Sequence, residues 1–391
     1  MSVPHRCLHP AFFLAIAVLP SLCGGRLHAD ALYTVTNLGQ IQLPGSYSLN
    51  NSGEVVGNLA NGSPFLYQSS GPSAGTFTNL GAAVGANTNL TGINDSGQII
   101  GNQVVGYVPP REGAGGFVGD LTQAILYSGG QVTKIPMLPG ENSNSAVGIN
   151  NSGMIIGNSG GTAFSNAGSN GYIYQNGQIT NLGNNGPTAV SNSGLVTGGS
   201  GFLYQNGHTL TGLPSSAGPT PYAINNSGEV VGSFWAPNGH GYDSLHAFLY
   251  QNGHMTDLGA LAGNASGVAL GINSVGQVVG DYVSSSGPYG SLNRAFLYQN
   301  GALTDLNTVI PATSGWFLTG GVAINDRGQI LATGVGPDGS WAGKQDVFLL
   351  TPTIAPSPVP EPGTLAFFGL IALGLGLRRA RQLRGSVATE L

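Results

Sequence analysis

The segment Ala223–Leu258 decides the fold, because it contains AINNSGEVVG (223–232), then AFLYQNG (247–253) and finally MTDL (255–258). Asn-Gly between two apolar runs is typical of a two-residue hairpin turn in which both residues take positive φ. In AINNSGEVVG, the Asn side chain can bond the backbone two residues on and the glycine supplies a left-handed conformation, which predicts a second tight turn. Each such segment therefore predicts two hairpins, or four short antiparallel strands.

The first of these motifs occurs seven times, with an AFLYQNG-like motif between successive copies. The central glycines of the seven copies are Gly53, Gly97, Gly153, Gly194, Gly228, Gly276 and Gly328. They lie 34 to 56 residues apart, a range that is typical of propellers and related arrays. Because four-stranded units repeated radially are propeller blades, the sequence predicts an all-β, seven-bladed β-propeller of four-stranded antiparallel blades over residues 30–352.

The two ends of the repeat domain indicate how the ring closes. The seventh unit has the segment Val347–Leu350 but lacks the Thr-Asp-Leu-Gly element that follows it in other units. A variant of that element, Tyr33–Gly39, stands unpaired at the other end of the domain. We therefore expect the N-terminal strand to pair beside Val347–Leu350 and complete the last blade. An open solenoid would instead need capping units with a polar outer face.

The repeat resembles the HAF family of extracellular repeats, named from a His-Ala-Phe tripeptide. His246-Ala247-Phe248 carries the tripeptide literally, whereas Arg294-Ala295-Phe296 and Asp346-Val347-Phe348 keep part of it. The resemblance spans about residues 32–352. It implies an extracellular repeat protein and says little about activity.

The charge of the repeat domain excludes nucleic acid as a partner. Between residues 30 and 358 there are five Lys and Arg against 14 Asp and Glu. Nucleic-acid binding needs clustered cations that neutralise phosphates, and these five are scattered along an acidic domain.

The N-terminal segment 1–29 is predicted to be a secretory signal peptide, with Arg6 before the apolar run Pro10–Leu22. Both cysteines of the chain, Cys7 and Cys23, fall in it, so the exported protein would have no disulfide. A lipoprotein signal centred on Cys23 and an uncleaved membrane anchor are the alternatives. The apolar run is short for an anchor.

The C-terminal segment has three parts in a fixed order. A proline-rich spacer over 353–362 ends in Pro360-Glu361-Pro362, and the segment 363–384 contains an apolar run expected to form a helix. The basic cluster in that segment consists of Arg378, Arg379, Arg381 and Arg384. The apolar run can enter a bilayer, and the arginines stop transfer and leave 385–391 as a short cytoplasmic tail.

This order resembles the PEP-CTERM sorting signal of Gram-negative, exopolysaccharide-producing bacteria. The resemblance covers about the last 30 residues, and Pro360, Glu361 and Pro362 carry it. It implies an exosortase-type processing protease as a partner, with contact to the membrane through the tail before processing. An ordinary C-terminal membrane anchor is the alternative.

The repeat domain offers few candidates for catalysis, and we predict no catalytic residue, metal or cofactor. His246 and His254 flank one hairpin, with Asp243 and Asp257 close in sequence, so one interpretation is a metal or acid–base site there. The other is that His254, like His208, occupies the variable position after Asn-Gly. The tyrosines of the Phe-Leu-Tyr motifs are expected to pack between blades rather than to stack on sugars.

Binding is expected on long, variable loops, because loops on a rigid scaffold usually carry recognition. Four segments are candidates: Gln103–Leu121, Asn158–Asn170, Ser233–Leu245 and Tyr282–Asn293. The sequence thus predicts an exported, surface- or matrix-associated protein, either a non-enzymatic binder of an extracellular glycan or surface protein or a structural component of the biofilm. The alternative is a propeller-type polysaccharide lyase or glycosidase, which paired carboxylates facing the central channel would favour.

Overall fold

The hairpin turns take the backbone conformations that their sequences predict. In the computed structural model of the chain, Asn252 and Gly253 have φ values of 50° and 80°, and Asn300 and Gly301 have 52° and 79°. Both residues of each pair are thus at positive φ, as a type I′ turn requires. The seven central glycines of the Asn-x-x-Gly turns are also at positive φ, for example 70° at Gly97.

The structure describes residues 32–40, 47–71, 74–108, 119–160, 170–210, 212–213, 218–237, 243–261, 266–284, 292–336 and 345–353. They form seven four-stranded antiparallel sheets. From the innermost strand outward, the first three are β2 (Ser48–Leu49), β3 (Glu54–Asn58), β4 (Pro64–Gln68) and β5 (Thr76–Asn79); β6 (Thr88–Ile93), β7 (Ile99–Val108), β8 (Gly119–Ser128) and β9 (Gln131–Lys134); β10 (Ser143–Ile149), β11 (Ile155–Gly160), β12 (Asn170–Gln175) and β13 (Gln178–Gly183).

The other four blades follow the same order. They are β14 (Pro187–Val190), β15 (Val196–Gly198), β16 (Phe202–Gln205) and β17 (His208–Leu210); β18 (Thr220–Ile224), β19 (Val230–Pro237), β20 (Asp243–Gln251) and β21 (His254–Asp257); β22 (Gly267–Ile272), β23 (Val278–Ser284), β24 (Leu292–Gln299) and β25 (Ala302–Asp305); β26 (Phe317–Ile324), β27 (Ile330–Val335), β28 (Asp346–Pro352) and β1 (Tyr33–Gln40). The short helices α1 (Gly81–Val84), α2 (Leu258–Leu261), η3 (Leu306–Thr308) and η4 (Ala312–Ser314) connect one blade to the next, and η1 (Gly199–Gly201) lies within the fourth.

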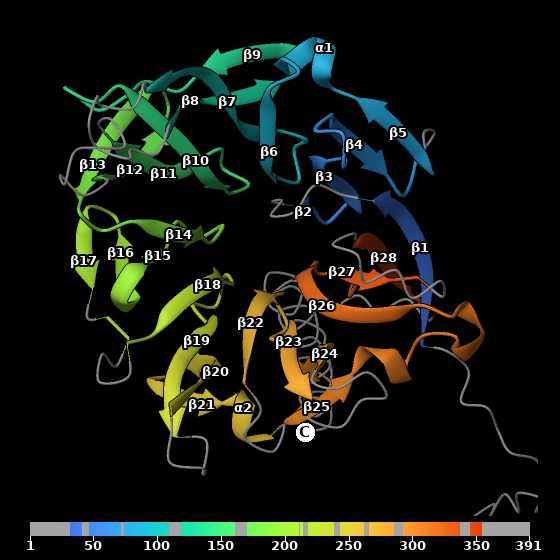
Figure 1. The fold of residues 1–391 in the computed structure, drawn as a ribbon. Coiled ribbons are helices and arrows are strands. Elements are labelled where there is room, and N and C mark those ends of the chain that lie inside the picture. The colour runs from blue at the N-terminus through green and yellow to red at the C-terminus, as the bar shows by residue number, and fades with distance from the viewer. Residues whose placement is uncertain are drawn as a thin grey trace, which may run out of the picture. The chain divides into compact units, whose positions relative to one another are not determined.

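The blades stand in a ring, and the predicted closure is confirmed (Figure 1). β1 is the outermost strand of the seventh blade and pairs antiparallel with β28, with Tyr33 opposite Pro352 and Val35 opposite Leu350. The backbone N–H of Thr353 donates to the carbonyl of Leu32 at 2.9 Å. The fold is therefore a seven-bladed β-propeller in which a strand from the start of the domain completes the last blade.

The cores of the propeller lie between neighbouring blades. Between the sixth and seventh blades, for example, Val279 and Leu297 pack with Leu318, Ile330 and Phe348. Six further clusters of this kind follow around the ring. Each sheet thus buries both of its faces against its neighbours.

The tyrosines of the Phe-Leu-Tyr motifs pack between blades, as predicted. Tyr67 is buried, and Tyr174 and Tyr250 are half-buried against the inter-blade clusters. The glycine that ends each Val-Val-Gly run has a packing role that the motif alone does not show. A Cβ on Gly280 would collide with the carbonyl oxygen of Val268 and with the Phe296 ring.

Candidate functional site

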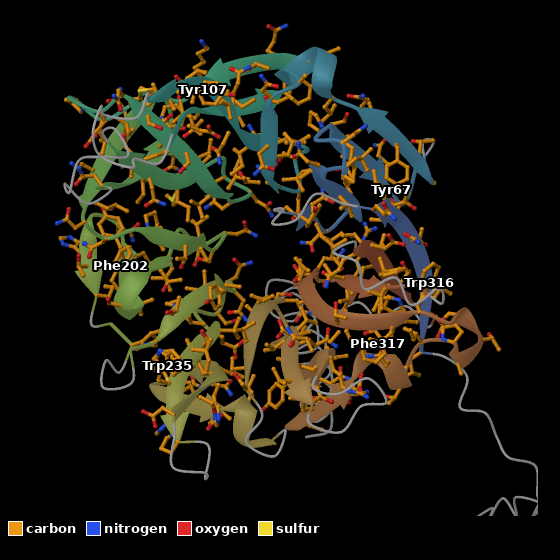
Figure 2. The ribbon with its side chains drawn as sticks, viewed as in Figure 1. Tyr67, Tyr107, Phe202, Trp235, Trp316 and Phe317 are labelled. Carbon is orange, nitrogen blue, oxygen red and sulfur yellow. The ribbon has the colours of Figure 1, made fainter. Side chains whose placement is uncertain are left out.

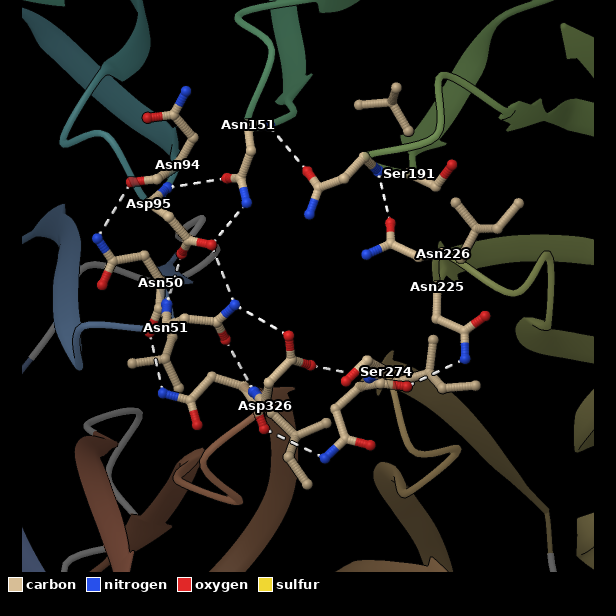
Figure 3. Close-up of a pocket in the computed structure, with 18 of the residues that line it drawn as sticks. Asn50, Asn51, Asn94, Asp95, Asn151, Ser191, Asn225, Asn226, Ser274 and Asp326 are labelled. Carbon is tan, nitrogen blue, oxygen red and sulfur yellow. Dashed lines mark hydrogen bonds between the residues drawn. The ribbon is translucent and has the colours of Figure 1, made fainter. Parts of the chain in front are cut away.

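A polar pocket lies on the propeller axis, at the end where the seven Asn-x-x-Gly turns converge (Figure 3). Every blade contributes the last residue of its innermost strand, such as Ile93 or Ile272, and one or both of the first two residues of the turn that follows. The pocket holds about 160 Å³, room for on the order of ten waters. Its wall is therefore aliphatic and its rim consists of amide, carboxylate and hydroxyl side chains.

The first residue of each turn forms an inner ring of buried side chains. Its Oδ1 accepts backbone N–H groups two and four residues on, at 3.1 Å from Ser96 and 3.0 Å from Gln98 to Asn94. Its Nδ2 donates to the carbonyl of the equivalent residue in the next blade, at 2.9 Å from Asn94 to Asn150. Six of the seven turns make this inter-blade bond; the donors are Asn50, Asn94, Asn150, Asn225, Asn273 and Asn325.

The exception in the inner ring is Ser191, which stands where the other blades have asparagine. Its Oγ accepts from the N–H of Leu195 at 3.1 Å, so the turn is still capped. A serine has no amide to donate across to the fifth blade. Within the described residues, the carbonyl of Asn225 is therefore bonded only by Gly228 of its own turn, at 3.1 Å.

The second residue of each turn forms an outer ring on the rim. Each Oδ1 accepts the N–H of the preceding turn, at 2.7 Å from Asn51 to Asp95 and at 2.8 Å from Asn192 to Asn226. Six of the seven links exist; their acceptors are Asn51, Asp95, Asn151, Asn192, Asn226 and Asp326. The seventh position is Ser274, and in the described part of the chain the N–H of Asn226 has no acceptor.

Two carboxylates lie on the rim of the pocket. Asp95 Oδ2 accepts from Asn51 Nδ2 at 3.0 Å and from Asn151 Nδ2 at 2.6 Å. Asp326 Oδ2 accepts from the same Asn51 nitrogen at 3.0 Å. The two carboxylates are neighbours joined by one amide, and donors of the ring already occupy their oxygens.

The histidines are not brought together as the metal or acid–base interpretation required. His246 Nδ1 lies 2.9 Å from Asp257 Oδ2, and the His246 side chain is buried. His254 is exposed at the far end of the same hairpin, opposite Gln251. No group of three or more His, Cys, Asp or Glu side chains that could hold a metal occurs among the described residues.

The next blade shows that this pair is a recurring element of the repeat. Arg294 and Asp305 occupy the positions of His246 and Asp257, and their Nη1 and Oδ2 atoms are 2.7 Å apart. In the last blade, Asn37 Nδ2 donates to Asp346 Oδ2 at 2.9 Å. The first residue of the His-Ala-Phe tripeptide therefore joins the third strand of a blade to the fourth.

In the four segments predicted as loops, the residues that the structure describes lie in strands. β7 and β8 extend from Ile99 to Val108 and from Gly119 to Ser128, and β19 and β20 reach Pro237 and Asp243. The loop prediction was wrong in these parts because continued antiparallel pairing satisfies the backbone, and the Gly- and Ser-rich composition concealed it. The tips of the four hairpins lie outside the described residues.

The hairpins of the second and fifth blades carry exposed aromatic side chains. Tyr107 on β7 is 65% exposed and Trp235 on β19 is 58% exposed. Both lie at the end of the propeller opposite the axial pocket, because β7 and β19 run away from the Asn-x-x-Gly turns. Figure 2 places them over different parts of the ring.

Asp281 on β23 is the described carboxyl group that burial affects most clearly. Burial raises its pKa to about 6. Asn293 Nδ2 donates to Asp281 Oδ1 at 3.3 Å. The equivalent position in the first blade is Asn58, which donates to the carbonyl of Thr88 in the next blade at 2.8 Å. Asp281 thus replaces an amide that joins neighbouring blades.

The predicted targeting residues lie outside the described part of the chain. These are the signal peptide 1–29, the motif Pro360, Glu361 and Pro362, and the arginines Arg378, Arg379, Arg381 and Arg384. Among the described residues, no helix has the length and apolar character needed to span a membrane.

No protein-family model matches the chain, and no curated protein matches its sequence. Solved structures of similar shape include the β-propeller domain of the Trilobed protease from Pyrococcus furiosus, at 7% identity and a TM-score of 0.47 over 84% of this chain and 100% of that one. A gluconolactonase from Xanthomonas campestris has 11% identity and a TM-score of 0.39 over 84% and 93%. An ulvan lyase has 13% identity and a TM-score of 0.30 over 78% and 79%. These identities are too low to transfer an activity to this chain.

Proposed function

We propose that this chain is an exported repeat protein of the cell surface or exopolysaccharide matrix, and that its propeller is a non-enzymatic binding or structural component there. The observation that carries the proposal is the uncharged composition of the strands that form the wall of the central channel. None of the seven innermost strands contains Asp, Glu, Lys, Arg or His. A polysaccharide-cleaving propeller would need an acid and a base or nucleophile at the reacting bond.

The carboxylates nearest the axis support the same proposal. Asp95 and Asp326 are bonded by Asn51, Asn151 and backbone N–H groups of neighbouring turns. Their hydrogen-bonding capacity serves the contact between blades. The ends of the sequence supply the proposed location, because the predicted signal peptide would export the domain and the sorting motif would hold it at the membrane until an exosortase-type protease removes the tail.

An enzyme is the second candidate, and one observation favours it. Asp95 and Asp326 both accept from Asn51 on the rim of an open pocket, and glycosidases use two carboxyl groups that flank the scissile bond. Replacing both by Asn keeps the acceptor for the backbone N–H of the preceding turn and removes both charges. Loss of turnover in this variant would establish the enzyme.

The test of the proposed function is a glycan-array screen of the purified protein, followed by assay of any bound polysaccharide for cleavage. We expect retention of one or more neutral or matrix-type glycans without degradation. Degradation of a bound polysaccharide would refute the non-enzymatic proposal. Absence of all binding would leave only the structural form of the proposal, a filler of the matrix.

A further inference from the structure

The two gaps in the axial rings fall on the same peptide group. The carbonyl of Asn225 lacks an inter-blade donor because Ser191 has no amide, and the N–H of Asn226 lacks an acceptor because Ser274 has no Oδ1. In each of the other six turns, side chains of neighbouring turns bond the carbonyl, the N–H or both groups of the equivalent peptide. Among the described residues, only the peptide between Asn225 and Asn226 lacks both of these bonds. The peptide group of the fifth blade therefore lacks a partner toward the fourth blade and another toward the sixth, and both of its residues line the pocket.

On this half of the rim, several side chains have donor groups that no protein atom accepts within the described residues. Asn192 and Asn226 use their Oδ1 atoms as ring acceptors, and within the described residues their Nδ2 atoms donate to no other group. Ser274 has a hydroxyl that likewise contacts no protein partner there, although its backbone N–H is bonded to Asp326. By contrast, Asn51 and Asn151 on the other half donate to carboxylates. The ring is thus closed on one side of the axis and open on the other.

We infer that this open sector of the axial pocket, between the turns of the fourth, fifth and sixth blades, binds a terminal uncharged sugar residue of a glycan. The inference rests on the proposed function and gives it a site. A sugar hydroxyl both donates and accepts, so one hydroxyl can fill the gap beside the Asn225 carbonyl and another can accept from the Asn226 N–H. The aliphatic side chains beneath, Val190, Ile224 and Ile272, suit the C–H surface of a pyranose ring.

The charges of the pocket select against other small ligands. An anion would meet the carboxylate of Asp326, which accepts the N–H of Ser274 beside the open sector, and that of Asp95 further around the rim. Among the described residues, no Lys or Arg lines the pocket to offset these charges. A cation would be drawn to those carboxylates, whose oxygens already accept amide and backbone donors. The open sector itself has uncharged donors and one carbonyl acceptor. A neutral polyhydroxyl group can accept from the donors and donate to the carbonyl.

The sugar would thus bind at the end of the propeller where the Asn-x-x-Gly turns converge, and not at the long hairpins of the opposite end. A site there also explains why serine replaces Asx at two positions that bound one turn. Elsewhere the chain repeats asparagine or aspartate at these positions, so the substitutions open the ring at one place.

The test closes the ring with the chain's own residues. Ser191→Asn introduces the side chain that all six other turns contain at the equivalent position, and Ser274→Asn introduces one that four other turns contain, the remaining two having Asp. The variant is therefore expected to fold. Ser227→Asn is the matched control, because Ser227 is exposed in the same turn and does not line the pocket. Each full-length protein is screened on a glycan array, and the strongest neutral oligosaccharide is then titrated by calorimetry, with the melting temperature measured in parallel.

We expect the wild type and Ser227→Asn to bind the oligosaccharide equally, and the ring-closing variant to bind at least tenfold more weakly with an equal or higher melting temperature. Equal binding by the ring-closing variant would overturn the axial site while leaving glycan binding intact. Preference of the wild type for acidic or amino-substituted glycans would overturn the assignment to an uncharged sugar. No glycan binding by the wild type would overturn both the inference and the binding form of the proposed function.

Discussion

The stability contributed by the Nδ2 hydrogen bond between blades can be measured separately from that of the turn cap, because one of the seven turns has the cap alone. Asn94 is 3% exposed, and its side chain makes four hydrogen bonds: two within the turn through Oδ1, and two through Nδ2, to Gln98 and to the carbonyl of Asn150. Ser191 keeps a turn cap without the inter-blade bond. Asn94→Ser should therefore remove mainly the Nδ2 bonds, and Asn94→Ala should remove all four.

A hydrogen bond contributes about 1 kcal/mol net, and a buried partner left unpaired costs about 1–3 kcal/mol. We expect Asn94→Ser to lower the free energy of unfolding by about 1–2 kcal/mol and Asn94→Ala by about 3–4 kcal/mol. Urea unfolding followed by tryptophan fluorescence and circular dichroism measures both values. Asn142→Ala, at an exposed position, is the control and should change stability by less than about 0.5 kcal/mol. Equal values for the Ser and Ala variants would refute the separate contribution of the cap, and an unchanged Ser variant would refute the inter-blade bond.

Three further perturbations test other parts of the structure. Burial raises the pKa of Asp281 from its ordinary value of 3.8 to about 6, so the folded state holds its proton more tightly. The stability of the wild type should therefore fall by up to about 3 kcal/mol as pH rises from 4 to 7. Asp281→Asn should abolish this component of the pH profile in urea titrations, and an unchanged profile would contradict the assignment. Thr36→Pro in β1, opposite Leu349, should remove a ladder donor at the closing blade and destabilise the fold by about 2 kcal/mol or more, so a wild-type melting temperature would refute closure by β1. Arg294→Met should cost about 3 kcal/mol because it leaves Asp305 without its cation. The double variant with Asp305→Leu should be destabilised by less than the sum of the two single variants, and an additive double variant would show that the pair is not coupled.

The fold could be predicted from the sequence because its decisive signals are local. Asn252-Gly253 fixes a hairpin by the φ values of two adjacent residues, and the Asn-x-x-Gly turn does the same within four. The ring closure was also predictable, since the strand missing after Val347–Leu350 had a close copy at Tyr33–Gly39. Counting repeated and missing elements required no knowledge of tertiary contacts.

The axial site was not predictable in the same way. The local sequence around Asn94 predicts a turn. The acceptor of its Nδ2, however, lies 56 residues further along the chain, where no local pattern indicates it. The substitution of Ser191 for asparagine was visible in the sequence, yet its consequence depends on the carbonyl of Asn225 being the acceptor. His246 was paired with His254 in one interpretation because they flank the same hairpin, whereas strand register places Asp257 beside His246 instead.

The most direct test of the account is to incubate the purified protein with the glycan it retains on the array and to measure released reducing ends and unsaturated products alongside binding. The account predicts stable binding, recovery of the glycan at its original length, and loss of that binding when Ser191 and Ser274 are replaced by Asn. Release of shortened products that disappears when Asp95 and Asp326 are both replaced by Asn would contradict it, because the axial carboxylates would then be catalytic residues and not part of the contact between blades.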